Sequence, residues 1–241
     1  MKALLLFDID GTLIDTEGAG LSSLEAGLFE AFPDRVDRPF PPLDLGGATD
    51  GSVVAFLFGH FEIEDHASHR ERFYESYSAA LEQQLKDHGE RGIGRVLPGV
   101  PELLDTLKEE FPDQVSALLT GNAEIGARMK LRHFGLDSHF SFGAFGDDHH
   151  DRNHLGPIAI QRAERFTGRQ FHMDQVIVIG DTVKDVRCAR ACGAKVIAVA
   201  TGTVSREELE KAEPDALLPD FSDHSLTMKV FCDAYSLARS Q

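Results

Sequence analysis

Two aspartates, Asp8 and Asp10, follow directly on a strongly apolar run near the start of the chain, "ALLLFDIDGT". Residues i and i+2 of a strand point to the same side, so both carboxylates should face a common space at the end of a predicted strand. Burying one carboxylate is costly, and two close together repel each other. A bound cation would make the pair tolerable; the alternative is a strand-to-turn exit with solvated aspartates. Gly11 permits a sharp turn there, and Thr12 can donate a hydrogen bond to an oxyanion.

A second pair of acids follows another buried run, "VIVIGDTVKD", which contains Asp181 and Asp185. Carboxylate oxygens suit Mg²⁺, which usually keeps several waters and takes one or two protein carboxylates. Asp181 at the end of a strand and Asp185 one helical turn later can both reach a cation held near Asp8. Capping of the following helix by Asp181 is the alternative, and it is compatible with metal binding.

A third polar segment, "LLTGN", ends with Thr120, Gly121 and Asn122. If a helix begins here, its free N–H groups and macrodipole favour an anion such as a phosphate group. A turn with a Thr or Asn cap has the same sequence pattern. Its location at the end of a predicted strand favours a phosphate-binding role.

The elements that position these residues are short apolar runs alternating with helical patterns. Continuous runs rich in Val, Ile and Leu are typical of strands buried on both faces of a parallel sheet. The alternation predicts an α/β fold, a doubly wound parallel sheet with a Rossmann-like core, whose ligands bind beyond the carboxyl ends of the strands. The predicted strands lie within 2–10, 115–122, 139–148, 175–182 and 194–202.

Residues 16–95 break this alternation. Two stripes of apolar residues at helical spacing, within 21–32 and 73–85, flank a proline-rich loop, and no strong strand pattern appears. We therefore predict a helical insertion after the first strand. The segment "LGGATDG", 45–51, could fold over the active site, with Thr49 and Asp50 as candidates for contact with the substrate. Helix capping is the alternative role for this segment.

The composition excludes several function classes. The formal net charge of −16 argues against a nucleic-acid or anionic-membrane surface, because such surfaces are bound by basic patches. No apolar stretch approaches the roughly 20 residues of a membrane span, and the first apolar run is too short for a signal peptide. Cys188, Cys192 and Cys232 are too few for a disulfide framework, so we expect a cytoplasmic protein. We expect Cys188 and Cys192 to pack rather than to bind a metal.

"DIDGT", "LLTGN" and "GDTVKD", in this order on predicted strand ends, resemble the haloacid dehalogenase superfamily of hydrolases and, within it, the phosphoglycolate phosphatase-like group. The resemblance implies that Asp8 is the nucleophile and forms an aspartyl-phosphate. It implies that Asp10 is the general acid and then the base. It also implies that Mg²⁺ is bound by Asp8, the backbone carbonyl of Asp10 and Asp181, with support from Asp185.

An acid two residues after the nucleophile resembles the phosphatase and phosphomutase branches, because the dehalogenases of the superfamily lack it. We therefore expect a hydrolase of a small phosphorylated metabolite, monomeric or homodimeric. A phosphomutase is the first alternative, and a non-catalytic binding protein that retains the fold is the second. The insertion resembles the cap domain of the superfamily, which would divide the chain into a core, 1–15 and 96–241, and a cap, 16–95.

One element departs from the pattern of the superfamily, whose phosphatases usually present a lysine ahead of the last motif. The corresponding stretch, "GDDHHDRNHLGP", holds no lysine, and we predict that Arg152 replaces it. A guanidinium can make bidentate contacts to phosphate or carboxylate. An exposed arginine is the alternative, and Lys184 is the less favoured substitute. The neighbouring histidines, which we interpret as a solvated loop rather than a transition-metal site, are His149, His150 and His154.

Overall fold

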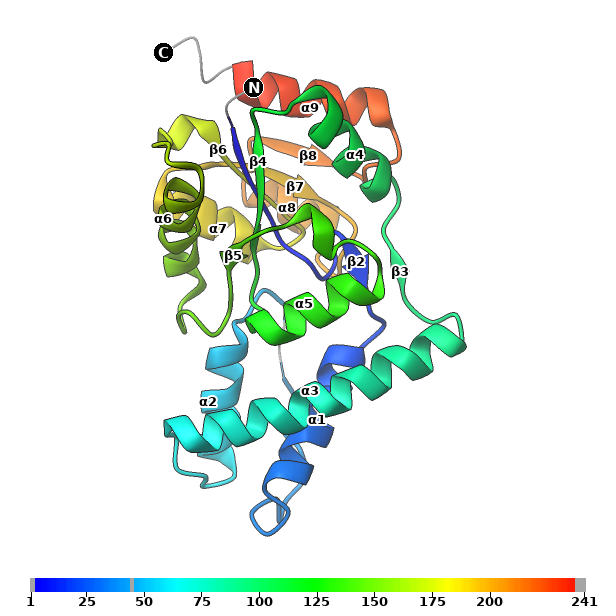
Figure 1. Cartoon of the computed structure of the whole chain (residues 1–241), viewed down its shortest axis with the longest axis vertical. Helices are drawn as coiled ribbons and strands as arrows, with labels where there is room; N and C mark the ends of the chain where they lie inside the picture. Colours follow the sequence, from blue (N-terminus) through cyan, green and yellow to red (C-terminus); the bar gives the residue numbers. More distant parts are fainter. Residues whose placement is uncertain (1–2, 44–45, 237–241) are drawn as a thin grey trace.

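The computed structural model describes residues 3–43 and 46–236, and its centre is a six-stranded parallel sheet (Figure 1). The strand order is β5-β4-β1-β6-β7-β8, which confirms the predicted doubly wound architecture. β5 is shorter than the sequence pattern suggested, and β8 was not predicted. The strands are β1 (Leu4–Phe7), β4 (Val115–Leu119), β5 (Gly143–Ala144), β6 (Val176–Gly180), β7 (Lys195–Val199) and β8 (Ala216–Leu218).

Helices cover both faces of the sheet, and each face has its own apolar cluster. Alternate residues of β1 pack on opposite sides: Leu5 and Phe7 join one cluster, whereas Leu4 and Leu6 join the other. The first cluster includes α4 (Val100–Glu110), α5 (Glu124–His133) and α9 (His224–Ser236). The second includes α6 (Leu155–Thr167) and α7 (Val183–Cys192), and the short α8 (Arg206–Lys211) lies between β7 and β8 in the chain. Burial on both faces explains why the strands are continuously apolar.

The insertion between β1 and β4 forms three helices, α1 (Ala19–Ala31), α2 (Asp50–His60) and α3 (Ala67–Glu90). They bury a separate apolar cluster and lie beyond the carboxyl ends of the central strands (Figure 1). α1 and α3 pack closely at Gly27, where the absence of a side chain permits the contact. A Cβ on Gly27 would lie only 2.7 Å from the backbone of Tyr77. The assignment of residues 16–95 as a distinct cap domain stays a prediction.

The two connections to the insertion lie side by side. β2 (Ile14–Asp15) and β3 (Arg95–Val96) form an antiparallel pair, and Arg95 donates a hydrogen bond to Asp15 at 3.3 Å. Neither strand was predicted from the sequence, because both lie outside the apolar runs. Among the described residues, no helix combines the length and the apolar character needed to cross a bilayer.

Candidate active site

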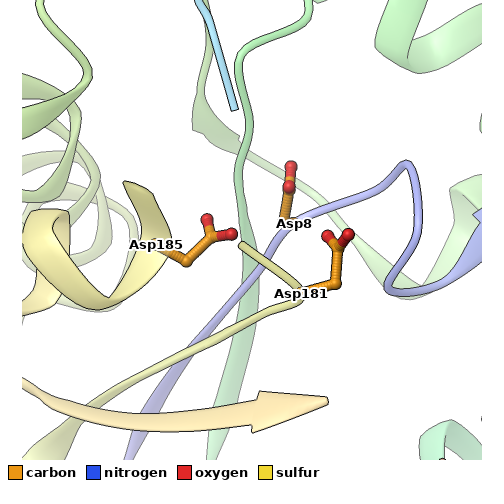
Figure 2. A group of neighbouring side chains, drawn as sticks. All are labelled: Asp8, Asp181 and Asp185. Carbon is orange, nitrogen blue, oxygen red and sulfur yellow. The ribbon is translucent and has the colours of Figure 1, made fainter. Parts of the chain in front are cut away.

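The ends of two adjacent strands bring three acids together. Asp8 follows β1 and Asp181 follows β6, and these strands pair in register, with Phe7 opposite Ile179. Asp185 comes from the first turn of α7. Figure 2 shows the three carboxylates around a common space, and one oxygen from each lies within 4.8 Å of the others. All three side chains are buried.

Asp185 is committed to contacts within the protein. Its Oδ2 accepts hydrogen bonds from the backbone N–H of Thr182 at 3.0 Å and from the Thr182 hydroxyl at 2.7 Å. Its Oδ1 accepts a hydrogen bond from Nη2 of Arg152. These contacts suit Asp185 to holding its neighbours in place rather than binding a cation directly.

Arg152 contacts two of these acids, Asp8 and Asp185. It lies in a short helical turn before α6, and its Nη2 is 3.2 Å from Oδ2 of Asp8. The guanidinium is buried, so its desolvation is offset by the charges of Asp8 and Asp185. Lys184 lies on α7 outside the residues that line the cavity around Asp8. The structure therefore brings Arg152, not Lys184, to the expected nucleophile.

The electrostatics of the cluster fit a divalent cation. Burial, with a contribution from Asp185, raises the pKa of Asp8 to about 6, although the charge of Arg152 opposes the shift. Burial, Asp185 and Asp8 raise the pKa of Asp181 well above its usual range. When all three carboxylates are ionised, they and the guanidinium carry two net negative charges, which a divalent cation would neutralise. Carboxylate oxygens are the ligand type that Mg²⁺ prefers.

The turn after β1 fits tightly against Asp181. Gly11 has a φ of 79°, and a Cβ there would lie 2.4 Å from a carboxylate oxygen of Asp181, so a side chain is excluded. The buried Thr12 hydroxyl donates a hydrogen bond to Oδ1 of Asp181 at 3.2 Å. Thr12 thus orients Asp181, and its predicted bond to a substrate oxyanion stays a prediction.

The predicted phosphate-binding segment lines the same cavity. Nδ2 of Asn122 donates hydrogen bonds to Oδ2 of Asp10 and to Oγ1 of Thr120, each at 2.8 Å. Gly121 is in close contact with the insertion. A Cβ at this position would lie 1.9 Å from the carbonyl oxygen of Ala48. Its own carbonyl accepts a hydrogen bond from the N–H of Asp50 at 2.7 Å. Thr120, Gly121 and Asn122 all face the cavity.

Thr49 and Asp50 divide the roles that the sequence left open. Thr49 is buried, caps α2 by accepting from the N–H of Ser52, and donates to the carbonyl of His150 at 2.8 Å. It is not among the residues that line the cavity, so its predicted substrate contact stays a prediction. Asp50 does line the cavity, and its carboxylate accepts from the N–H of Ala123 at 2.8 Å. Burial raises the pKa of Asp50 to about 6.

A cavity of about 590 Å³ lies between the end of the sheet and the inserted helices. Its floor contains Asp8, Asp10 and Asp181 from the strand ends. Its opposite wall is formed by side chains from all three inserted helices, including Leu21, Leu24, Val53 and Tyr77. The cavity therefore joins a strongly charged floor to a largely apolar wall.

Lys130 on α5 also belongs to this site, and it was not predicted from the sequence. Its side chain is almost fully buried, and its Nζ lies 2.7 and 2.9 Å from the two carboxylate oxygens of Asp10. A signal was present, because Lys130 shares the buried face of α5 with Ala127 and Leu131. A lysine on an apolar helix face is also typical of a side chain that extends to solvent, so the pattern alone was ambiguous.

The remaining candidate residues lie outside the cavity lining. The imidazoles of His149 and His154 stack with their centroids 4.0 Å apart, on the segment before α6. His150 contributes its carbonyl to the contact with Thr49. The buried Cys188 donates its thiol hydrogen bond to the carbonyl of Arg152 at 3.2 Å, so it supports the turn that carries the guanidinium.

Comparisons with known proteins agree with this arrangement. The chain is 29% identical over 236 residues to "Probable phosphatase IndB" of Dickeya dadantii, with 92% of each chain covered. It is 27% identical to "Phosphoglycolate phosphatase" of Agrobacterium fabrum, covering 96% of this chain and 93% of the relative. The crystal structure of a hydrolase from Pseudomonas syringae has the same fold, with a TM-score of 0.66, 23% identity, and coverage of 95% of this chain and 98% of that one.

The family model described as "Haloacid dehalogenase-like hydrolase" matches residues 5–199, which include all three motifs and the insertion. The resemblance predicted from "DIDGT", "LLTGN" and "GDTVKD" is thereby confirmed. The chain belongs to the haloacid dehalogenase-like hydrolase family.

Proposed function

We propose that this protein is a Mg²⁺-dependent phosphatase that hydrolyses a small phosphorylated metabolite through an aspartyl-phosphate on Asp8. One observation carries the proposal: Asp8 lies on the floor of the cavity between the Arg152 guanidinium, 3.2 Å away, and the carboxylate of Asp181. An attacking oxygen, a fixed positive charge and an acidic cation site are thus combined. The names of two relatives that align over nine tenths of the chain, a probable phosphatase and a phosphoglycolate phosphatase, support the choice of a phosphatase.

In the first step, a carboxylate oxygen of Asp8 attacks the phosphorus atom and forms the new P–O bond. The bond between phosphorus and the alcohol oxygen breaks, and Asp10 in its acid form gives its proton to that oxygen. A carboxylate is a competent covalent catalyst for this reaction, and a positioned acid removes the need to expel an alkoxide.

In the second step, Asp10, now a carboxylate, takes a proton from a water molecule that attacks the phosphorus atom. The bond between Asp8 and phosphorus breaks, which releases inorganic phosphate. Asp8 is again a carboxylate and Asp10 is again an acid, so the protons balance over the cycle. Asp10 lines the cavity beside Asn122, where both an alcohol and a water molecule can reach it.

The remaining residues bind and orient the phosphoryl group. Arg152 presents its guanidinium to the oxygens of the group, and Thr120, Asn122 and the Gly121 amide line the adjacent wall. Phosphoryl transfer depends mainly on such positioning and on neutralised charge. Mg²⁺ bound by Asp8, the carbonyl of Asp10 and Asp181, with Asp185 in support, would supply the charge that offsets repulsion between Asp8 and the phosphate.

The insertion, 16–95, acts in this proposal as a cap domain. Helices α1 and α2 supply Leu21, Leu24 and Val53 to the wall opposite the acids, so they contact the part of the substrate that departs as the alcohol. Separation of this wall from the core would admit the substrate, and its return would exclude bulk water. The paired segments β2 and β3 are the connection about which such a movement would occur.

The test is hydrolysis of p-nitrophenyl phosphate with and without Mg²⁺ by the wild type and by Asp8→Asn. We expect turnover that requires the metal and that Asp8→Asn lowers by at least about 10³-fold, since the nucleophile is lost. Asp113→Asn, which makes the same change at an exposed position, should match the wild type. Undiminished turnover by Asp8→Asn would overturn the proposal. A panel of phosphorylated metabolites then identifies the substrate.

A further inference from the structure

We propose that Lys130 is a positioning residue for catalysis, and that it acts by fixing the carboxylate of Asp10 for its acid and base roles. The proposal rests on the function assigned above to Asp10. It concerns a residue that none of the three sequence motifs contains. Lys130 comes from the middle of α5, and the loop after β1 supplies Asp10.

The ammonium group of Lys130 uses all of its hydrogen-bonding capacity inside the protein. Its Nζ lies 2.9 Å from Oδ1 and 2.7 Å from Oδ2 of Asp10, and 2.6 Å from Oδ1 of Asn122. An ammonium group has three N–H donors, and each has an acceptor here. Lys130 is therefore suited to hold Asp10 rather than to bind a substrate phosphate directly.

Asn122 completes the restraint from a second direction. Its Nδ2 donates to Oδ2 of Asp10 at 2.8 Å and to Oγ1 of Thr120 at 2.8 Å, while its Oδ1 accepts from Lys130. Both oxygens of Asp10 are thus held by groups from two other segments. The Asp10 side chain still keeps 40% of its surface exposed, so one side remains open to an alcohol or a water molecule.

The position of Lys130 argues for a role beyond structure. Only 5% of its side chain is exposed, and burying an ammonium group requires compensation that an apolar side chain of similar length would not need. Here the ion pair and hydrogen bonds with Asp10 offset the loss of hydration, and Asp10 is a residue that the proposed reaction uses. The ammonium group thus fixes the position of the carboxylate that the proposed reaction uses as acid and base, and correct positioning is what a proton-transfer group needs.

The insertion closes over this contact. A Cβ on Gly20, near the start of α1, would lie 3.2 Å from Nζ and 3.5 Å from Cε of Lys130. The absence of a side chain at Gly20 therefore lets α1 approach the ammonium group closely. The pair formed by Lys130 and Asp10 lies at the junction between the strand ends and the inserted helices, where the departing alcohol must pass.

The test compares Lys130→Met with the wild type in the full-length protein with Mg²⁺, on phenyl phosphate and on p-nitrophenyl phosphate. Phenolate is a poor leaving group that needs the acid, whereas p-nitrophenolate leaves with little help. We expect kcat/KM for phenyl phosphate to fall about 100-fold and kcat/KM for p-nitrophenyl phosphate to fall by less than about fivefold. Water activation also needs Asp10, so the variant should release a burst of nearly one nitrophenolate per enzyme before slow turnover.

Two further variants separate this role from a structural one. In the Asp10→Asn background, Lys130→Met should cause no further loss on phenyl phosphate, because Lys130 acts through Asp10. Lys130→Gln, which keeps N–H donors without the charge, should show the same order of substrates with a smaller loss, and it serves if Lys130→Met does not fold. Lys86→Met removes a lysine from an exposed position of α3 and should match the wild type on both substrates.

The outcomes are distinct. Equal losses on both substrates, additive losses in the double variant, or wild-type rates in Lys130→Met would each overturn the role of Lys130 while leaving the phosphatase in place. A wild type that hydrolyses neither ester, nor any member of the metabolite panel, would overturn the proposed function, and the role of Lys130 with it.

Discussion

Nη2 of Arg152 lies 3.2 Å from Oδ2 of Asp8, and the same nitrogen donates a hydrogen bond to Asp185. One guanidinium therefore holds the expected nucleophile against its supporting acid. We expect Arg152→Ala to lower kcat/KM for p-nitrophenyl phosphate by about 10²–10³-fold, since a preorganised charge at the phosphoryl group is lost. Lys184→Ala should change it by less than about threefold, because Lys184 lies outside the cavity lining. Similar losses in the two variants would contradict the assignment.

Arg152 also affects folding, so its stability effect must be measured separately. Removal leaves Asp8 and Asp185 buried without their cation, which should lower the free energy of unfolding by about 3–5 kcal/mol. Arg152→Lys keeps a positive charge and should lose less stability and less activity than Arg152→Ala. Urea unfolding monitored by circular dichroism gives the first quantity, and steady-state kinetics on the folded fraction gives the second.

Metal binding should be visible as a change in stability. In the metal-free protein, Asp181→Asn should raise the melting temperature, because one of three mutually repelling buried carboxylates is removed. Addition of Mg²⁺ should raise the melting temperature of the wild type, by the equivalent of about 2.7 kcal/mol at 100 times the dissociation constant. We expect Asp181→Asn to lose this Mg²⁺-dependent rise and Asp113→Asn to keep it. An unchanged rise in Asp181→Asn would place the cation elsewhere.

The part of the site that the sequence predicted depends on strand ends. Asp8 and Asp181 follow strongly apolar strands, and parallel neighbours in register must deliver such residues to the same edge. The helical insertion was predicted for a similar reason, since its apolar stripes recur at the helical period over several turns. A continuous apolar run that ends in an acid and an apolar stripe that recurs over several helical turns are both visible in a single sequence, so both features could be predicted.

The features that were missed have no comparable local pattern. β2 and β3 are two residues long each, and such short strands show no periodicity. The buried state of Lys130 depends on its contact with Asp10, which lies 120 residues earlier in the chain. Whether Thr49 or Asp50 faces the cavity depends on how α2 packs over Gly121, a tertiary contact that neither segment specifies alone.

We expect Asp50 to make the free energy of unfolding depend on pH. Its pKa in the folded state is about 6, above the usual 3.8, so the folded protein binds more protons at this group between these values. The free energy of unfolding therefore falls, through this group, as the pH rises from 4 to 6. Asp50→Asn removes the dependence, so the variant should gain stability relative to the wild type over that interval, by at most about 3 kcal/mol.

Thermal or urea unfolding of metal-free protein at pH 4.5 and pH 7.5 measures this difference. Asp37→Asn is the control with the opposite sign, because a hydrogen bond from Arg38 lowers the pKa of Asp37. Asp37 stabilises the folded state above its unfolded pKa, and that contribution is lost as the pH falls. The Asn variant at position 37 should thus lose a little stability relative to the wild type as the pH rises. A difference for Asp50→Asn that does not grow with pH would show that its carboxylate stays solvated.

Gly20 offers a test of the contact between α1 and Lys130 that leaves every charged group in place. Within a helix, alanine is more favourable than glycine by up to about 1 kcal/mol, so Gly20→Ala should not destabilise the fold. Its new methyl group would lie 3.2 Å from Nζ of Lys130 and displace the ammonium group from Asp10. We expect kcat/KM for phenyl phosphate to fall about tenfold, since small misplacements at a reacting group are costly, and p-nitrophenyl phosphate to be affected less.

Gly59→Ala is the matched control, because Gly59 lies in α2 and a Cβ there would meet no atom within 4 Å. It makes the same chemical change in an inserted helix and gains the same helix preference, so its stability should rise slightly while its activity stays at the wild-type level. Melting temperatures and the two esters are measured on both variants in parallel. If Gly20→Ala behaved like Gly59→Ala on phenyl phosphate, α1 would not press on the ammonium group, and the insertion would have no direct influence on Asp10 through Lys130.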